Sequence, residues 1–217
     1  MAHSIERATS GRAKCRACKQ TIVKDSYRLG EEVPNAFGEG TSTHWYHLAC
    51  GARQRAEAFL VAWRAFKDQP AAGELGVDTE GLEASAELGL TYYRLQRFVR
   101  AERAPSGRAR CQGCRKLIEK GELRFVLQRI EDGVVGGAGF VHLACAHEYA
   151  GAVDEIVDRV APLSELDDSS WNEVKSELSR QAQLPRTVKI PFKAQDQAEG
   201  DDEVSEPSEP SEPSEPS

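Results

Sequence analysis

The sequence is poor in the residues that build large cores or membrane spans. Aromatic residues make up 7% of its 217 residues, methionine occurs once, and 29% of the residues are charged. No run of about 18 apolar residues occurs, which excludes an ordinary transmembrane helix. The N-terminal segment lacks the apolar region of a signal peptide. We therefore expect an intracellular protein, in the nucleus of a eukaryote or in the cytoplasm or nucleoid of a bacterium, with no membrane partner.

Cysteine is also scarce, and its six copies fall in a repeated pattern. SGRAKCRAC at 10–18 recurs as SGRARCQGC at 106–114, and HLAC at 47–50 recurs at 142–145. The offset between copies is 96 residues from Gly11 to Arg28 and 95 residues from His47 to Cys50. This pattern indicates an internal duplication of one small domain, shortened by one residue in the second copy.

Each copy holds three cysteines, which cannot all pair within one domain, and intracellular thiols are normally reduced. One histidine per copy brings the set to four, the number of ligands that a structural zinc ion takes. The sequence therefore predicts two zinc ions, held by Cys15, Cys18, His47 and Cys50, and by Cys111, Cys114, His142 and Cys145. Four protein ligands leave no open position, so both sites should be structural. With every cysteine assigned to metal, and with no glycine-rich nucleotide loop, we expect no catalysis.

The charges are unevenly distributed along the chain. From Ala194 onward there are nine acidic residues and no Lys or Arg. Residues 1–55 carry nine Lys/Arg against five Asp/Glu, and residues 94–145 carry eleven against five. Basic regions of this kind favour a polyanionic partner, although a solvated charged surface would have the same composition. The Ser-Glu-Pro repeat at the end predicts a disordered acidic tail. The tail is expected to be a solubilising spacer, or alternatively a regulatory segment that competes electrostatically with a nucleic acid, and it is also a candidate site for protein partners.

The apolar periodicity predicts an α+β protein of small zinc-stabilised domains, with short antiparallel hairpins and flanking helices. Hairpins are expected over 21–33 and 116–130, and helices over 52–66, 82–102, 146–163 and 168–183. The expected organisation is a zinc finger with a trailing helix over 1–67, a helical linker over 68–93, a second finger with a trailing helix over 94–162, a C-terminal helix over 163–184 and a disordered tail over 185–217.

The motifs SGRAKC, C-x-x-C, KDSYR and HWYHLAC together resemble the zinc finger at the N-terminus of poly(ADP-ribose) polymerases and of a eukaryotic DNA ligase. The 28 residues between Cys18 and His47 are typical of that finger. The resemblance covers roughly residues 7–55 and 100–149, and it implies two tandem fingers. It also implies binding to DNA nicks and strand ends by structure rather than by sequence.

The resemblance further implies roles for matched arginines. Arg12 and Arg28 correspond to family positions that contact backbone phosphate or the groove near a break, and Arg108 and Arg124 correspond to them in the second copy. Arginine suits this role because its planar guanidinium can donate two hydrogen bonds to one phosphate.

An apolar residue in the loop before the histidine ligand is implied to stack on the base pair that a break exposes. Phe37 matches it in the first copy, and Val134 and Val135 take its place in the second. The family has a second apolar residue later in this loop, where this chain has the polar run 41–43. A hairpin-core role for Phe37 remains an alternative.

The sequence thus predicts a non-catalytic, zinc-dependent protein that recognises DNA strand breaks. Two alternatives remain open, a zinc-scaffolded protein–protein adaptor and a binder of single-stranded nucleic acid. An adaptor would not need Arg12, Arg28, Arg108 and Arg124 to line one exposed basic face.

Overall fold

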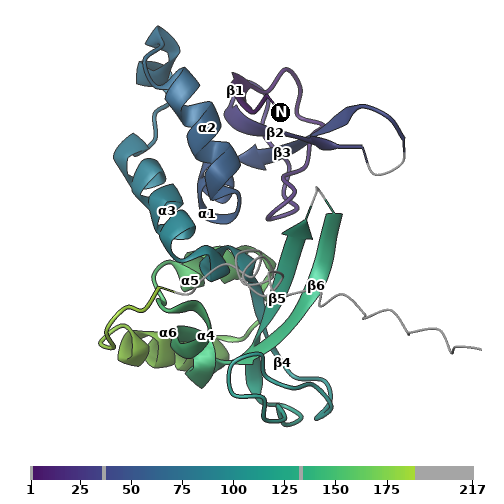
Figure 1. Ribbon diagram of the computed structural model, residues 1–217, viewed down its shortest axis with the longest axis vertical. Helices are drawn as coiled ribbons and strands as arrows, with labels where there is room; N and C mark the ends of the chain where they lie inside the picture. The colour runs from purple at the N-terminus through teal and green to yellow at the C-terminus, as the bar shows by residue number, and fades with distance from the viewer. Residues whose placement is uncertain (1, 36–37, 132–133, 189–217) are drawn as a thin grey trace, which may run out of the picture.

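The computed structural model of the protein describes residues 2–35, 38–131 and 134–188, with only the backbone described at 130, 131, 134 and 135. The chain forms two units of one design, the first above the second in Figure 1. Each has a three-stranded antiparallel sheet with helices on one side, which confirms the α+β class. No helix in the described part of the chain is long and apolar enough to cross a membrane.

The first unit contains a sheet in the order β1-β2-β3 and three helices. Its elements are β1 (Ser4–Arg7), β2 (Tyr27–Pro34), β3 (Thr41–His47), α1 (Leu48–Gln54), α2 (Ala56–Phe66), the 3-10 turn η1 (Pro70–Glu74) and α3 (Thr79–Thr91). The predicted apolar stripe of α2 is buried, with Phe59, Leu60, Trp63 and Phe66 each at most 5% exposed. These side chains share one buried core with Leu29 and Ile22, and the helix packs against β1 and β2 of the sheet.

The second unit repeats the sheet, in the order β4-β5-β6, but surrounds it differently. Its elements are η2 (Tyr93–Arg97), β4 (Phe98–Arg103), β5 (Leu123–Glu131), β6 (Val134–His142), η3 (Leu143–Cys145), α4 (Ala146–Ala150), α5 (Ile156–Val160), η4 (Ala161–Leu163) and α6 (Asp168–Gln181). Helix α6 confirms the predicted C-terminal helix, and the Asp167 side chain caps it by accepting a hydrogen bond from the Ser170 amide.

Two predicted helices are shorter than the periodicity indicated. The helix expected over 82–102 ends at Thr91, and its last part is instead the edge strand β4. The helix expected over 146–163 is interrupted after Ala150, where Gly151 adopts φ 82°. A left-handed glycine ends a helix readily because it has no Cβ. In both places tertiary context overrides local helix preference.

The two units are docked through charged and polar side chains. Arg159, on α5, is 2% exposed and donates to the backbone carbonyl of Arg53 on α1. Glu155 accepts from Arg159 at 3.1 Å and from the Ser85 hydroxyl on α3 at 2.6 Å. The side chain of Gln96 accepts from the Ala56 amide at the start of α2. These bonds join α1, α2 and α3 to the second unit, so the two repeats are packed together.

The chain follows the second unit beyond its last helix. Arg186 pairs with Asp154 at 2.5 Å, and the Thr187 amide donates to the Gly151 carbonyl at 2.8 Å. Most of the predicted acidic tail, residues 189–217, lies outside the described residues.

Candidate metal centres and nucleic-acid interface

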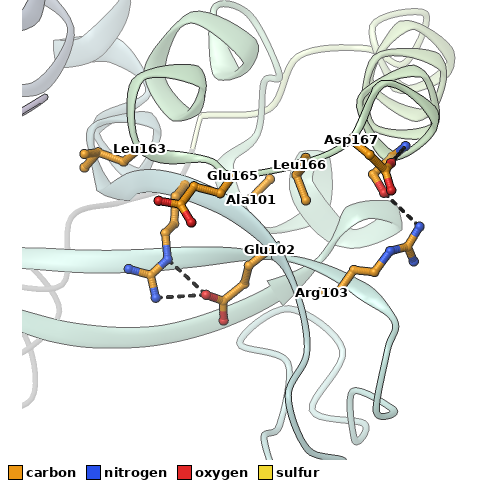
Figure 2. A pocket seen from close by; sticks show the side chains of 9 residues that line it. Ala101, Glu102, Arg103, Leu163, Glu165, Leu166 and Asp167 are labelled. Carbon is orange, nitrogen blue, oxygen red and sulfur yellow. Dashed lines mark hydrogen bonds and ion pairs between the residues drawn. The ribbon is translucent and has the colours of Figure 1, made fainter.

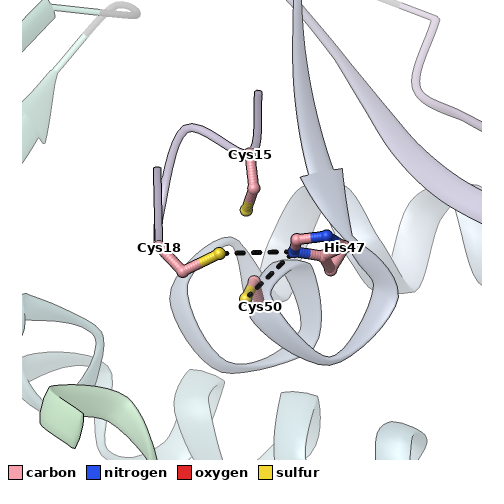
Figure 3. Close-up of side chains that lie close together, drawn as sticks. All are labelled: Cys15, Cys18, His47 and Cys50. Carbon is pink, nitrogen blue, oxygen red and sulfur yellow. Dashed lines mark hydrogen bonds between the residues drawn. The ribbon is translucent and has the colours of Figure 1, made fainter. Parts of the chain in front are cut away.

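The first repeat brings its four predicted ligands to one point. Cys15 and Cys18 lie on the loop before β2, His47 ends β3, and Cys50 lies in the first turn of α1. Their side chains point toward one another in Figure 3, and their ligand atoms lie within 4.8 Å of one another. His47 Nδ1 is 3.3 Å from the Cys18 sulfur and 3.9 Å from the Cys50 sulfur. A tetrahedral zinc ion would need separations of roughly 3.5–3.8 Å, so the spacing fits this ion.

The second repeat has the same arrangement. Cys111, Cys114, His142 and Cys145 form the other compact group in the described part of the chain. His142 Nδ1 lies 3.4 Å from the Cys114 sulfur and 3.8 Å from the Cys145 sulfur. The protein therefore has two Cys3His sites, consistent with two zinc ions.

Backbone groups hold both histidine rings in the orientation that a metal needs. His47 Nε2 lies 3.3 Å from the Thr21 carbonyl, and His142 Nε2 lies 3.1 Å from the Leu117 carbonyl. A proton on Nε2 leaves Nδ1 unprotonated and facing the cysteines, as zinc ligation requires. Thr21 and Leu117 stand 96 residues apart, so this support is repeated with the ligands themselves.

The thiols could not all ionise without a cation among them. A hydrogen bond from Cys50 lowers the pKa of Cys15 to about 4, and the same hydrogen bond, together with burial, raises the pKa of Cys50. In the second site burial raises the pKa of Cys145 to about 12, whereas the Lys116 amide lowers the pKa of Cys114 to about 7. Three neighbouring thiolates repel one another, so a zinc ion supplies the charge that this donor set needs.

The loops that carry the cysteine pairs are strongly basic and exposed. We call residues 11–24 and 107–120 the knuckles. Each knuckle has five Lys/Arg, and all ten side chains are exposed: Arg12, Lys14, Arg16, Lys19 and Lys24, then Arg108, Arg110, Arg115, Lys116 and Lys120. None of these ten has a carboxylate partner within the described residues, although arginines elsewhere in the chain are mostly paired. Each metal site therefore lies within a positive surface that its own unit does not neutralise.

Arg28 and Arg124 lie elsewhere, in the middle strand of each sheet, and are buried to 7% and 4% exposure. Arg28 donates to Glu6 at 2.7 Å, and its guanidinium lies 3.5 Å from the centre of the Trp45 ring. Arg124 donates to Glu102 at 2.6 Å and lies 3.6 Å from the Phe140 ring.

The four predicted arginines therefore do not share one exposed face. Arg12 and Arg108 are exposed, whereas each of the other two is held between a carboxylate and an aromatic ring. Trp45 and Phe140 are partly buried at the margins of the two cores.

The sequence reasoning missed the carboxylates Glu6 and Glu102, and a signal for them was present. They are separated by the same 96 residues as the arginines they pair with. Extending the repeat four residues upstream of Ser10 would have aligned Glu6 with Glu102 and Arg7 with Arg103. In the structure the aligned segments both lie on edge strands, β1 and β4.

Among the residues predicted to read the exposed base, Val134 and Val135 fall in the described part of the chain. Phe37 lies outside the described residues, between β2 and β3. Val134 and Val135 begin β6 and pair with Glu131 and Ile130, and only their backbone is described.

A polar hollow lies beside β4, one of the two outer strands of the second sheet (Figure 2). Its wall carries Arg100 and Arg103 together with Glu102, Glu165 and Asp167. Arg100 is paired with Glu102 at 2.8 Å, and Arg103 donates to the Ser170 hydroxyl at 2.9 Å. Both arginines of the hollow are thus engaged within the protein, and its wall carries no unpaired cation among the described residues.

Comparison with known proteins agrees with this geometry. Residues 6–69 match the family described as "Poly(ADP-ribose) polymerase and DNA-Ligase Zn-finger region". Poly [ADP-ribose] polymerase 1 of Gallus gallus is 34% identical over an alignment of 132 residues that covers 57% of this chain and 13% of that protein. The protein of the same name from Oryza sativa subsp. japonica is 26% identical over 156 residues, 70% of this chain and 15% of that protein.

The chain thus spans only a small part of the length of these relatives, and the family match falls on the first of its two metal-binding repeats. The second repeat has the same four ligands at the same offset, on a sheet of the same order. Residues 6–69 are therefore a zinc finger of the poly(ADP-ribose) polymerase and DNA-ligase type, and the second repeat has the construction of a further copy.

Proposed function

We propose that this protein binds DNA at nicks and strand ends through its two zinc fingers and has no catalytic activity of its own. The observation that carries the proposal is the pair of knuckles, each with five exposed cations that no carboxylate of the described chain neutralises. An ordered, unneutralised positive surface is the usual footprint of a nucleic-acid backbone. Its repetition at the same place in both fingers supports a shared partner rather than a chance distribution of charge.

Within this proposal the predicted contacts divide into two groups. Arg12 and Arg108 are exposed and free of carboxylates, so they contact phosphate directly. Arg28 and Arg124 already donate to Glu6 and Glu102, and a phosphate would have to compete with those carboxylates. We therefore infer that Arg28 and Arg124 act mainly by fixing the strands that carry the hairpin tips.

Phosphate contacts alone cannot distinguish a break from an intact duplex. We propose that Phe37 in the first finger, and Val134 and Val135 in the second, stack on the base pair exposed at the break. An aromatic contact of this kind contributes on the order of 1–3 kcal/mol per base. The preference for a break would come from this contact, and the affinity for any duplex would come from the knuckles.

The proposal is tested with one circular DNA prepared closed, nicked, gapped and linear. We expect binding to the nicked, gapped and linear forms to exceed binding to the closed circle at equal salt. Equal binding to all forms would contradict break recognition and leave a general duplex binder. An absence of salt-dependent binding to any form would favour the protein–protein adaptor instead.

A further inference from the structure

The segment between the fingers carries a second kind of basic site. The turn η2, Tyr93–Arg97, packs against α1 and α3 of the first unit and against α4 and β5 of the second. It follows the matched region 6–69 and precedes the repeated strand β4. Its residues therefore lead into the first strand of the second sheet and lie where the two units meet.

Two arginines of this turn are held in place by tyrosine rings. The Arg94 guanidinium lies 5.1 Å from the centre of the Tyr149 ring, and its Nη1 donates to the Tyr149 carbonyl at 3.0 Å. The Arg97 guanidinium lies 5.1 Å from the Tyr93 ring, and its Nη1 donates to the Tyr149 hydroxyl at 3.3 Å. Contacts of a cation with a ring face at these distances are attractive and orient the planar group.

Neither arginine has a carboxylate partner within the described residues. This distinguishes them from Arg53 and Arg159, which lie at the same junction and share Glu155. Arg94 Nη2 and both Arg97 Nε and Nη2 have no hydrogen-bond acceptor in the described chain, and none of them is among its buried unsatisfied atoms. These donors are therefore not fully buried, and both side chains are partly exposed.

We propose that Arg94 and Arg97 form a third phosphate-binding site, which holds the DNA backbone between the two fingers. The site rests on the proposed function and adds that one DNA crosses the junction and touches both repeats. Oriented guanidinium groups with free donors lose little conformational freedom on binding, and their fork matches a phosphate. If Arg94 and Arg97 served only to hold Tyr149 in place, each would use one edge of its guanidinium group. That role would not account for their unneutralised charges or for their free donors.

The test is the salt dependence of binding to one nicked duplex, measured for the full chain. The double variant Arg94→Gln/Arg97→Gln should bind about tenfold more weakly or worse, and its slope of log K against log salt should fall by about 1.8, the loss of two phosphate contacts. The matched control is Arg64→Gln/Lys175→Gln, which removes two exposed cations that lie on helices α2 and α6 and have no ion pair among the described residues. The control should keep the wild-type slope.

A second double variant distinguishes phosphate binding by Arg94 and Arg97 from a purely structural role of their planar groups. The variant Arg94→Lys/Arg97→Lys keeps both charges but loses the planar groups that lie on the tyrosine rings. We expect it to keep the wild-type slope and two zinc ions. Two results would contradict the third phosphate-binding site. The double Gln variant could keep the same salt slope as the control, or the double Lys variant could lose as much slope as the double Gln variant. If the wild-type protein showed no measurable binding to the nicked duplex, both this site and the proposed function would be wrong. If the wild-type protein bound with a normal salt slope and the double Gln variant had the same slope, only this site would be wrong.

Discussion

Three strands contribute one side chain each to the stack around the buried arginine. In the first finger these are Glu6 from β1, Arg28 from β2 and Trp45 from β3. The large Trp45 ring has room because its cross-strand neighbour is Gly30, where an added Cβ would lie 2.7 Å from the ring. In the second finger the corresponding pair is Val126 with the smaller Phe140. The two repeats thus fill the same space with opposite combinations of large and small residues.

This compensation predicts a coupled pair of substitutions. Gly30→Val alone should reduce the free energy of unfolding by about 1–3 kcal/mol, because it overpacks the sheet against Trp45. Adding Trp45→Phe should recover at least half of that loss, since the resulting pair is the one found in the second finger. Denaturant unfolding of the two single variants and the double variant measures the coupling. Strictly additive losses would show that the two positions do not share this space.

Arg12 and Arg28 should differ in what their removal does. Arg12→Gln removes an exposed charge, so it should change stability by less than about 0.5 kcal/mol while weakening DNA binding and lowering its salt slope by about 0.9. Arg28→Gln removes a buried cation from Glu6 and Trp45, so it should cost on the order of 1–3 kcal/mol of stability. Thermal unfolding and DNA titration on the same samples separate the two effects. A destabilised Arg12→Gln with a wild-type salt slope would contradict the division of roles.

Among the elements, each metal site is built from one loop, one strand end and one helix of its own repeat. Cys50 lies on α1, which is separated from α2 by the non-helical Arg55. The metal site of the first finger, here called site 1, thereby fixes the start of the helical layer that covers the first sheet. A small domain of this type gains much of its folding free energy from the ion.

Cys50→Ala should therefore reduce bound zinc from two equivalents to one and unfold the first finger. Cys145→Ala is the matched change in the second finger and should leave site 1 loaded. Elemental analysis of each purified variant gives the stoichiometry, and circular dichroism gives the loss of folded structure. Retention of two tightly bound ions by Cys50→Ala would contradict the assigned ligand set.

The sequence was sufficient for features that depend on local spacing. The cysteine–histidine pattern identified both ligand groups, and the apolar stripe of 59–66 identified the face of α2 that is buried. Features that depend on tertiary pairing were missed or misread. The segment 98–103 is strand because β5 pairs with it, although its composition favoured helix. The burial of Arg28 likewise depends on Glu6, a partner brought from a distant strand.

At the level of the whole molecule, the packing of the two repeats depends on a buried cation. Arg159 has a fully buried side chain that pairs with Glu155 and donates to the end of α1, and Arg53 also pairs with Asp158 at 3.6 Å. A charge buried in this way is stable only while its partners are in place. The packed junction also places the two knuckles in a fixed relation to each other.

Arg159→Gln should consequently loosen the junction, at a cost of roughly 3–5 kcal/mol for a broken buried pair. We expect calorimetric unfolding to change from one transition to two, because each finger has its own core and its own ion. Arg180→Gln is the control, since it breaks an exposed pair within α6 that contributes less than about 1 kcal/mol. A single, unshifted transition for Arg159→Gln would show that the junction does not depend on this residue.

The most direct test of break recognition compares one duplex before and after its nick is sealed by a ligase. Length, sequence and charge are then nearly identical, so the ratio of the two dissociation constants isolates the contact available only at the break. We predict a clear preference of the wild-type protein for the nicked duplex, reduced by up to roughly tenfold in Phe37→Ala, the loss expected for one stacking contact of about 1–1.5 kcal/mol. Arg12→Gln should weaken binding to both duplexes and leave the ratio unchanged. Equal affinity of the wild-type protein for the nicked and the sealed duplex would contradict the proposal that these fingers recognise breaks.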